Sequence, residues 1–342
     1  MSDIVTTGAP PTCSFLPQQP LHGGVLGAVH FGDRAAGPSL TAPVGASPDA
    51  GAGVSLALHT GGASGAEGFT ETWAAEGPVT SGTYQGIHYA HDERNLFCAV
   101  RVPASPRYAE STERVYEGCL SLVESLGFDS VYRVWHYISD LNGDNADGLE
   151  VYRDFCLGRA RALERHGRTR SMPAATVIGT HGGGLVLYLL ARRGPGAVNL
   201  ENPGQTPAYE YPARYGPRSP NFARASWLPG TCGSRGHMYV SGTAAILGHA
   251  TMHQGDVTAQ CHLALDNVAR VIGPDNATRH GLDHGFALDD LRLAKVYLRA
   301  AEDLETVRGV CRQRLSPGTE VRYVVGDVCR ADLLVELEAV AW

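Results

Sequence analysis

The chain has 342 residues, of which 43% are hydrophobic and 18% charged, a composition typical of a globular protein that excludes disorder throughout. Its net charge is −7 and Lys295 is its only lysine, so we expect no basic surface for a nucleic-acid backbone. The start lacks the basic and apolar regions of a signal peptide, and no run approaches about 18 apolar residues, so we expect a cytoplasmic protein that crosses no membrane. The eight cysteines are scattered without a C-x-x-C pair, which favours free thiols over a disulfide framework.

The N-terminal segment gives weak structural signals. Residues 1–20 hold four prolines and little periodicity, so we predict an arm rather than a core element. Short strands are predicted at Gly23–Phe31 and Val54–His59. The glycine-rich segment Gly61–Gly65 that follows is predicted to be a flexible connector.

From residue 84 onward the predicted elements alternate between strand and helix. They are strands Gly86–Ala90 and Leu96–Val102, helix Tyr108–Leu126, strand Val131–Ile138, helix Leu149–His166 and an extended pair within Ala175–Leu190. The order returns after residue 236 with strands His237–Ala244 and Ala245–His249, helix Val257–Ile272, strand Leu291–Leu298, helix Ala301–Arg314 and a final strand. The repetition predicts an α+β fold of two tandem units, an N-terminal domain over 21–192 and a C-terminal domain over 193–342.

The final strand, which begins near Leu333, has an unusual second face. Every second residue from Leu333 is apolar, the pattern of a strand with one buried face. The opposite face places Glu336 and Glu338 among aliphatic residues. Such a face is more typical of solvent exposure, yet a carboxyl group beside aliphatic neighbours can gain a raised pKa and act as an acid.

Three motifs with metal-binding or phosphate-binding character fail on spacing. Asp140–Asp147 begins like a calcium loop but lacks the glycine and the bidentate glutamate that such a loop requires. Gly179–Gly184 leads into a strand-like run instead of a helix N-terminus. His249 and His253 have a spacing that suits metal ligands only on a helix, whereas their segment has the pattern of a strand and turn. We therefore expect no metal ion.

The segment from residue 208 to 225 concentrates arginine and tyrosine. It contains Arg214, Arg218, Arg224, Tyr209, Tyr211 and Tyr215. Guanidinium forks and phenol hydroxyls suit a small planar carboxylate ligand, because they orient the anion and provide a flat wall. A surface loop with extended arginines is the alternative. The local excess of arginine in an acidic chain favours the anion site.

Together these stretches resemble the chorismatase family. The resemblance extends from about residue 80 to the end and rests on Tyr132–Ile138, Gly179–Gly183, Glu201–Gln205, Tyr215–Pro220, Phe222–Ala225, Ser241–Ala244, Gly326–Arg330 and Leu334–Glu336. Each half also resembles the RidA/YjgF fold, which is chorismate-mutase-like, with mixed sheets and helices packed on one face. This resemblance agrees with the repeat.

The resemblance implies chorismate as the substrate and Glu336 as the acid that protonates its enolpyruvyl ether, without a cofactor. It implies as candidate ligands of the two substrate carboxylates Arg224, Tyr215, Tyr211 and Arg218, with Arg153 as a weaker candidate. One branch of the family hydrolyses chorismate to pyruvate and 3,4-dihydroxycyclohexa-1,5-dienoate, and another forms 3-hydroxybenzoate and pyruvate. Gly242, which would give the ring room, and Cys329, which would assist aromatisation, match the second branch.

Two alternatives to the 3-hydroxybenzoate branch stay open at this point. One is the hydrolytic branch, and the other is a RidA-like ligand-binding or imine-handling protein without lyase activity. Single RidA-like domains form trimers, but two fused copies can make one such interface internally, so we expect a monomer.

Overall fold

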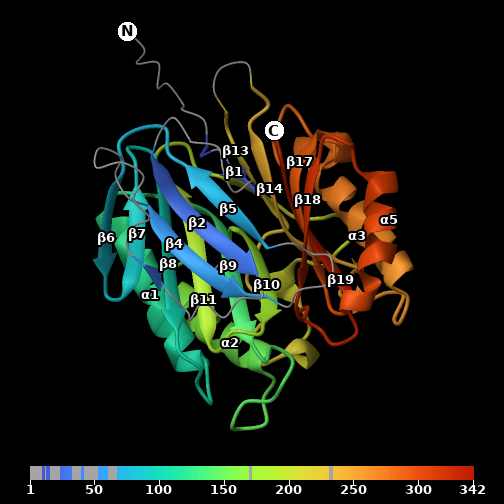
Figure 1. The fold of residues 1–342 in the computed structure, drawn as a ribbon, viewed down its shortest axis with the longest axis horizontal. Helices are drawn as coiled ribbons and strands as arrows, with labels where there is room; N and C mark the ends of the chain where they lie inside the picture. The colour runs from blue at the N-terminus through green and yellow to red at the C-terminus, as the bar shows by residue number, and fades with distance from the viewer. Residues whose placement is uncertain are drawn as a thin grey trace.

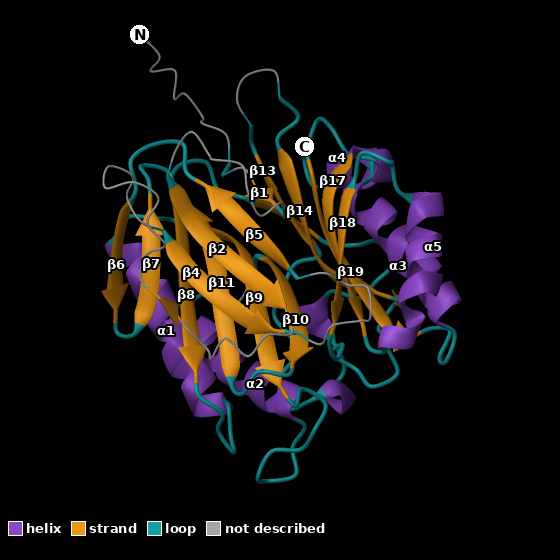
Figure 2. Cartoon of the chain, viewed as in Figure 1, coloured by secondary structure: helices purple, strands orange, loops and turns teal. Residues whose placement is uncertain are grey.

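The structure, a computed structural model, describes residues 10–11, 13–15, 24–32, 40–41, 53–60, 68–168, 172–230 and 234–342. Its elements form three larger β-sheets, and the helices lie on the outer sides of the second and third sheets (Figures 1 and 2). The inner faces of all three sheets meet in one core, to which each contributes an aromatic residue such as Trp73, Trp135 or Tyr297. None of the described helices is long and apolar enough to span a lipid bilayer.

The first sheet is built from the N-terminal region and has the strand order β1-β5-β2-β4-β3. Its strands are β1 (Cys13–Ser14), β2 (Val25–Gly32), β3 (Leu40–Thr41), β4 (Val54–His59) and β5 (Phe69–Ala74). The prediction of an arm over residues 1–20 is wrong for Cys13–Phe15, because Cys13 pairs with Trp73 and the side chains of Cys13 and Phe15 are buried. A two-residue strand is too short for a periodic signal. The predicted connector Gly61–Gly65 lies outside the described residues.

The second sheet has the order β10-β9-β11-β8-β7-β6. Its strands are β6 (Thr80–Tyr84), β7 (Ile87–His91), β8 (Asn95–Val102), β9 (Ser130–Ser139), β10 (Ala174–Thr180) and β11 (Leu185–Arg192). The helices α1 (Ala109–Ser125) and α2 (Val151–Arg165) pack on its outer face, where residues such as Leu122 and Phe155 meet Leu187 of β11. The predicted helices and strands of this half are therefore present, with ends shifted by a few residues.

The third sheet has the order β12-β13-β14-β19-β17-β18. Its strands are β12 (Val198–Leu200), β13 (Ala225–Leu228), β14 (His237–Ala244), β17 (Leu291–Leu298), β18 (Glu320–Val325) and β19 (Val335–Ala341). The outer face carries α3 (Val257–Ile272) and α5 (Leu304–Arg314), with α4 (Pro274–Arg279) beside them (Figure 1). A two-stranded hairpin, β15 (Ile246–Leu247) and β16 (Ala250–Thr251), and the short 3₁₀ helices η1 (Ala208–Glu210), η2 (Ala213–Tyr215), η3 (Leu288–Asp290) and η4 (Ala301–Asp303) complete the described elements.

The second and third sheets are copies of one topology, which confirms the tandem α+β fold. Reading from β10 and from β18, the orders β10-β9-β11-β8-β7-β6 and β18-β17-β19-β14-β13-β12 correspond strand for strand. The pairs β9–β10 and β17–β18 are parallel, and each is joined through a helix as a parallel crossover requires. The predicted boundary between residues 192 and 193 falls between β11 and β12.

The final strand lies in the middle of the third sheet. β19 pairs with β14 on one side and with β17 on the other. Val335 and Leu337 face the core under α3, whereas Glu336 and Glu338 face the other sheets and are each 4% exposed. The interpretation of a solvent-exposed face is therefore wrong, because a strand pattern shows which residues share a face but not what covers it.

The cysteines of the described chain are free thiols, as expected. They are Cys13, Cys98, Cys119, Cys156, Cys261, Cys311 and Cys329. Cys232 lies outside the described residues. The fold is therefore held by packing and by buried polar contacts, without disulfide bonds between described residues.

Candidate active site

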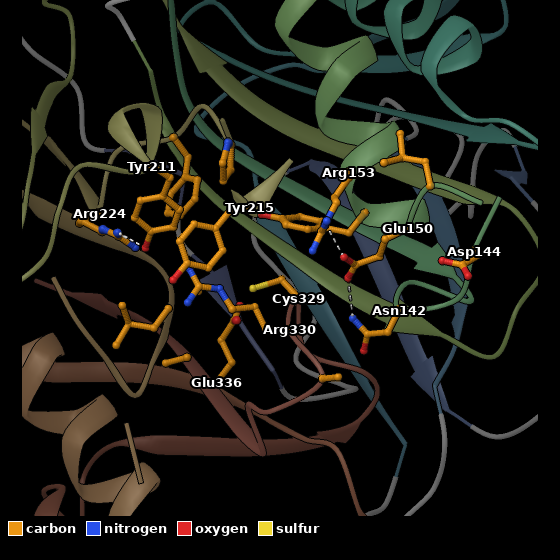
Figure 3. A pocket seen from close by; sticks show the side chains of 18 of the residues that line it. Asn142, Asp144, Glu150, Arg153, Tyr211, Tyr215, Arg224, Cys329, Arg330 and Glu336 are labelled. Atoms are coloured by element: carbon orange, nitrogen blue, oxygen red, sulfur yellow. Dashed lines mark hydrogen bonds and ion pairs between the residues drawn. The ribbon is translucent and has the colours of Figure 1, made fainter. Parts of the chain in front are cut away.

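A cavity of about 470 Å³ opens between the second and third sheets. Four parts of the chain form it: the segment from the end of β9 to the start of α2, the segment between β12 and β13, the end of β14, and the segment that leads into β19. Its lining includes Arg153, Tyr211, Tyr215, Arg224, Gly242, Cys329, Arg330 and Glu336. Seven of the eight predicted site residues therefore lie together (Figure 3).

Arg218 is the predicted residue that the structure places elsewhere. It does not line the cavity, and its guanidinium pairs with Glu164 of α2 at 2.8 Å, with both side chains a little under half exposed. An irregular loop has no regular side-chain periodicity, so the sequence does not indicate which arginine points into the cavity. The sequence alone therefore could not distinguish Arg218 from Arg224. We no longer consider Arg218 a carboxylate ligand.

Glu336 brings a carboxyl group to the cavity from the central strand β19. It is 4% exposed, and no described residue forms an ion pair or hydrogen bond with its carboxyl group. Burial, followed by repulsion from Glu338, raises its pKa to about 8, although Arg133 and Arg224 oppose the rise. Glu336 is therefore largely a neutral carboxylic acid at neutral pH, able to donate a proton to a bound molecule.

Gly242 leaves the space that the Glu336 carboxyl group occupies. A β-carbon at position 242 would stand 1.9 Å from Oε1 of Glu336 and 3.3 Å from Cγ2 of Thr176. The residue lies on β14 at an irregularity in the pairing with β19, which brings the two backbones and the carboxyl group together. Gly242 therefore makes room for the Glu336 carboxyl group, and its expected role in giving the substrate ring room stays a prediction.

Cys329 forms part of the cavity wall beside Glu336. Its side chain is half-buried and packs against a small hydrophobic cluster that includes Val328 and Ile246. Burial, followed by the charge of Glu336, raises the pKa of the thiol to about 12. Cys329 is therefore a neutral thiol at neutral pH, a weak hydrogen-bond donor and not a thiolate nucleophile.

Two arginines and two tyrosines line the cavity near Cys329 and Glu336 (Figure 3). Arg224 donates through Nη2 to the hydroxyl of Tyr211 at 2.9 Å and to the carbonyl of Thr206 at 3.0 Å. The guanidinium of Arg330 lies 4.1 Å from the ring centre of Tyr215, a cation–π distance. The predicted tyrosines therefore contact the two arginines directly.

Arg330 belongs to the Gly326–Arg330 motif, but the sequence did not predict a role for it. Its Nη1 donates to the carbonyl of His249 at 2.9 Å, while its buried Nη2 has no partner among the described residues. Nε of Arg224 is buried and unpartnered in the same sense. Two guanidinium groups with unused donors suit an anionic ligand.

Arg153 lies apart from these groups on the α2 side of the cavity. Its Nε pairs with Glu150 at 2.7 Å, and Asn142 lies within 3.5 Å of the same carboxyl group (Figure 3). This pairing compensates its charge, so Arg153 is a weaker candidate for an anion ligand than Arg224 or Arg330. Among the described residues, no cluster of histidine, cysteine and carboxylate side chains is arranged to hold a metal ion.

Comparison with known proteins identifies the family. Residues 71–191 match the family described as chorismatase FkbO/Hyg5-like, N-terminal. The chain is 50% identical over 278 residues to a 3-hydroxybenzoate synthase of Streptomyces hygroscopicus, covering 80% of this chain and 82% of that protein. It is 50% identical over 275 residues to a chorismatase of Streptomyces rapamycinicus, with 80% and 82% covered.

A solved structure extends the likeness to the whole fold. The crystal structure of a chorismatase is 45% identical, superposes with a TM-score of 0.89, and covers 98% of this chain and 99% of its own. The chain belongs to the chorismatase family of enzymes.

Proposed function

We propose that this chain converts chorismate into 3-hydroxybenzoate and pyruvate, with Glu336 as the proton donor. The observation that carries this proposal is a buried, neutral carboxylic acid at the wall of a cavity that also holds two arginines with unused donors. A relative that shares half of its residues over most of both chains is named 3-hydroxybenzoate synthase, which supports the same product.

The proposed binding mode follows from the charges of the substrate. Chorismate carries one carboxylate on its ring and another on its enolpyruvyl side chain. Arg224 and Arg330 are the proposed ligands, because each keeps a buried nitrogen free to donate. Tyr211 and Tyr215 hold these guanidinium groups in place through a hydrogen bond and a ring contact, respectively.

The proposed reaction begins with transfer of the Glu336 proton to the methylene carbon of the enol ether, which creates an oxocarbenium-like centre. The ring hydroxyl attacks the ring carbon that bears the ether, and the carbon–oxygen bond breaks with its electron pair on the departing pyruvate. The hydroxyl proton passes to the Glu336 carboxylate, which restores the acid and leaves an arene oxide. The oxide then opens with the bonding electron pair on oxygen, the ring carbon loses its proton and the oxygen takes up one proton, which gives 3-hydroxybenzoate. Atoms and electrons balance without water or a redox partner.

The proposed role of Cys329 is to assist the opening of the oxide. As a neutral thiol in the cavity wall, it can donate a hydrogen bond to the ring oxygen as charge develops there. It does not need to form a covalent bond to the substrate. This role is limited to the aromatisation step and leaves the initial protonation to Glu336.

Product analysis tests the proposed function. Purified protein incubated with chorismate should yield 3-hydroxybenzoate and pyruvate in equal amounts, measured by chromatography and an enzymatic pyruvate assay. Pyruvate with the non-aromatic dihydroxycyclohexadienoate would instead indicate the hydrolytic branch. Absence of pyruvate from protein that binds chorismate would indicate a ligand-binding protein.

The rate should depend on pH through the protonation of Glu336. Because the acid form is the active one and its pKa is raised to about 8, kcat/KM should be constant below that pH and fall roughly tenfold per unit above it. Steady-state kinetics with chorismate across this pH range measures the falling part of the profile, which is its basic limb. A rate that rises with pH through the same range would show that the ionised form of Glu336 is active.

Replacing Cys329 with alanine should change the products more than the binding of substrate. We expect the share of 3-hydroxybenzoate to fall severalfold while KM changes less than about threefold, because the thiol acts after protonation. Cys311→Ala, which removes a buried thiol from α5 away from the cavity, is the control and should keep the wild-type products. An unchanged product ratio in Cys329→Ala would remove this residue from the mechanism.

A further inference from the structure

A second carboxylate lies directly behind the proposed acid. Glu338 is two residues beyond Glu336 on β19, so the two side chains share one face of the strand. Four donors converge on Glu338: Arg133 at 2.7 Å, Lys295 at 2.8 Å, Thr176 at 2.5 Å and Trp135 at 2.9 Å. With all these donors aimed at its two oxygens, Glu338 is held as an ionised carboxylate.

The two cations come from different parts of the chain. Arg133 lies on β9 of the second sheet, and Lys295, the only lysine of the protein, lies on β17 of the third. Lys295 also pairs with Glu71 of β5 in the first sheet, at 2.5 Å. The side chains of this cluster are at most 5% exposed, so their charges are not shared with solvent.

The charges within this cluster balance without Glu336. Arg133 and Lys295 supply two positive charges, and Glu71 and Glu338 supply two negative ones. A charged Glu336 would add a third buried carboxylate next to this balanced cluster, and no described residue forms an ion pair with it. Burial raises the pKa of Glu71 as well, but Lys295 pairs with Glu71 directly and favours its ionised form.

The groups that face Glu336 from the neighbouring elements differ in their effect on its protonation. Arg133 from β9 and Arg224 from the segment before β13 favour its ionised form, whereas Glu338 on its own strand opposes it. Cys329 from the preceding segment is a neutral thiol. Among these groups, Glu338 is the one charge that favours the proton on Glu336.

Thr176 connects the carboxylate cluster to the strand beside the acid. Its hydroxyl donates to Glu338 and accepts from the backbone N–H of Gly242 at 3.0 Å and from Nη2 of Arg133 at 2.6 Å. Gly242 is the residue against which the Glu336 carboxyl group rests. The cluster therefore fixes the backbone at the acid as well as the local charge.

We propose that Glu338, held ionised by Lys295 and Arg133, is a positioning residue that keeps Glu336 protonated and directed into the cavity. This inference rests on the proposed role of Glu336 in chorismate turnover. It assigns a function in the reaction to a carboxylate outside the cavity lining and to the single lysine of the chain.

The experiment compares pH profiles of kcat/KM for chorismate in matched variants. In Glu338→Gln the basic limb should move to lower pH by about 1 unit or more, because the adjacent negative charge is gone. Should that variant fold poorly, the charge-balanced double variant Glu338→Gln/Lys295→Met should show the same shift. Glu71→Gln is the control: it removes a carboxylate from the same lysine, but Glu71 is not among the groups that perturb Glu336, so its limb should stay in place.

The outcomes separate this inference from the proposed function. If Glu338→Gln and the double variant keep the basic limb of kcat/KM at the wild-type pH, the proposed role of Glu338 is overturned, while Glu336 remains the proposed acid. If the basic limb of the pH profile shifts equally in Glu71→Gln and Glu338→Gln, the cluster has only a structural role. That result would also overturn the proposed role of Glu338. Full activity in Glu336→Gln would contradict the proposed function itself. Infrared difference spectra, in which the protonated carboxyl band of Glu336 is assigned by its loss in Glu336→Gln, should show that band disappear at lower pH in Glu338→Gln.

Discussion

Replacing Glu336 with glutamine should lower kcat for chorismate by about 10³-fold, within the range that a positioned general acid contributes. Glutamine keeps the size of the side chain and its place on β19, but it has no proton to give to the enol ether. Because the substituted side chain is neutral, as Glu336 itself is at neutral pH, substrate binding should change little. Single-turnover kinetics with chorismate and calorimetric binding of 3-hydroxybenzoate measure the two effects separately.

The control for this experiment is the same substitution at a distant surface position. Glu305 lies on α5, and its side chain is 73% exposed, so Glu305→Gln should retain the wild-type rate. Glu336→Asp provides a graded test, because it keeps an acid but withdraws it by one methylene group, and it should retain partial activity. A Glu336→Gln variant with wild-type kcat would show that another group supplies the proton.

Replacing Gly242 with alanine should reduce the formation of 3-hydroxybenzoate by about 100-fold or more. The added β-carbon would stand 1.9 Å from Oε1 of Glu336, so the carboxyl group must move by more than an ångström. Displacements of about that size in a catalytic group cost on the order of 10²-fold in rate. Because the assignment to the 3-hydroxybenzoate branch rests partly on Gly242, we also expect the non-aromatic diol among the products.

A matched glycine supplies the control for that variant. Gly309 lies on α5, and a β-carbon added there meets no atom within 4 Å, so Gly309→Ala should leave both rate and products unchanged. Thermal unfolding of both variants distinguishes lost activity from lost fold. A folded Gly242→Ala enzyme with the wild-type rate and products would show that the Glu336 carboxyl group does not depend on this glycine.

Local patterns in the sequence were sufficient to predict most of the two tandem halves. The helix predicted over Val257–Ile272 and the strand predicted over Leu291–Leu298 have these bounds in the structure. The first sheet was not recognised as a separate layer, because its strand pairs such as Cys13 with Trp73 join residues far apart in the chain. Periodicity is a local property and carries no information about such pairs.

Site residues could be predicted where the side chain itself indicates the chemistry. They were missed where the chemistry depends on neighbours that are distant in the chain. Glu336, Cys329 and Arg224 lie at the cavity as expected, whereas Arg218 points to Glu164 instead. The cluster around Glu338 could not be predicted, because Arg133 and Lys295 approach it from other strands. The monomeric state and the cytoplasmic location stay predictions.

The most direct test of the proposed chemistry follows an oxygen atom through the reaction. Chorismate labelled with ¹⁸O in its ring hydroxyl is incubated with the purified protein, and the ring product is analysed by mass spectrometry. We expect 3-hydroxybenzoate that retains the label, because the ring hydroxyl attacks the neighbouring carbon and becomes the phenol oxygen. A non-aromatic diol as the main product, or 3-hydroxybenzoate without the label, would contradict this proposal.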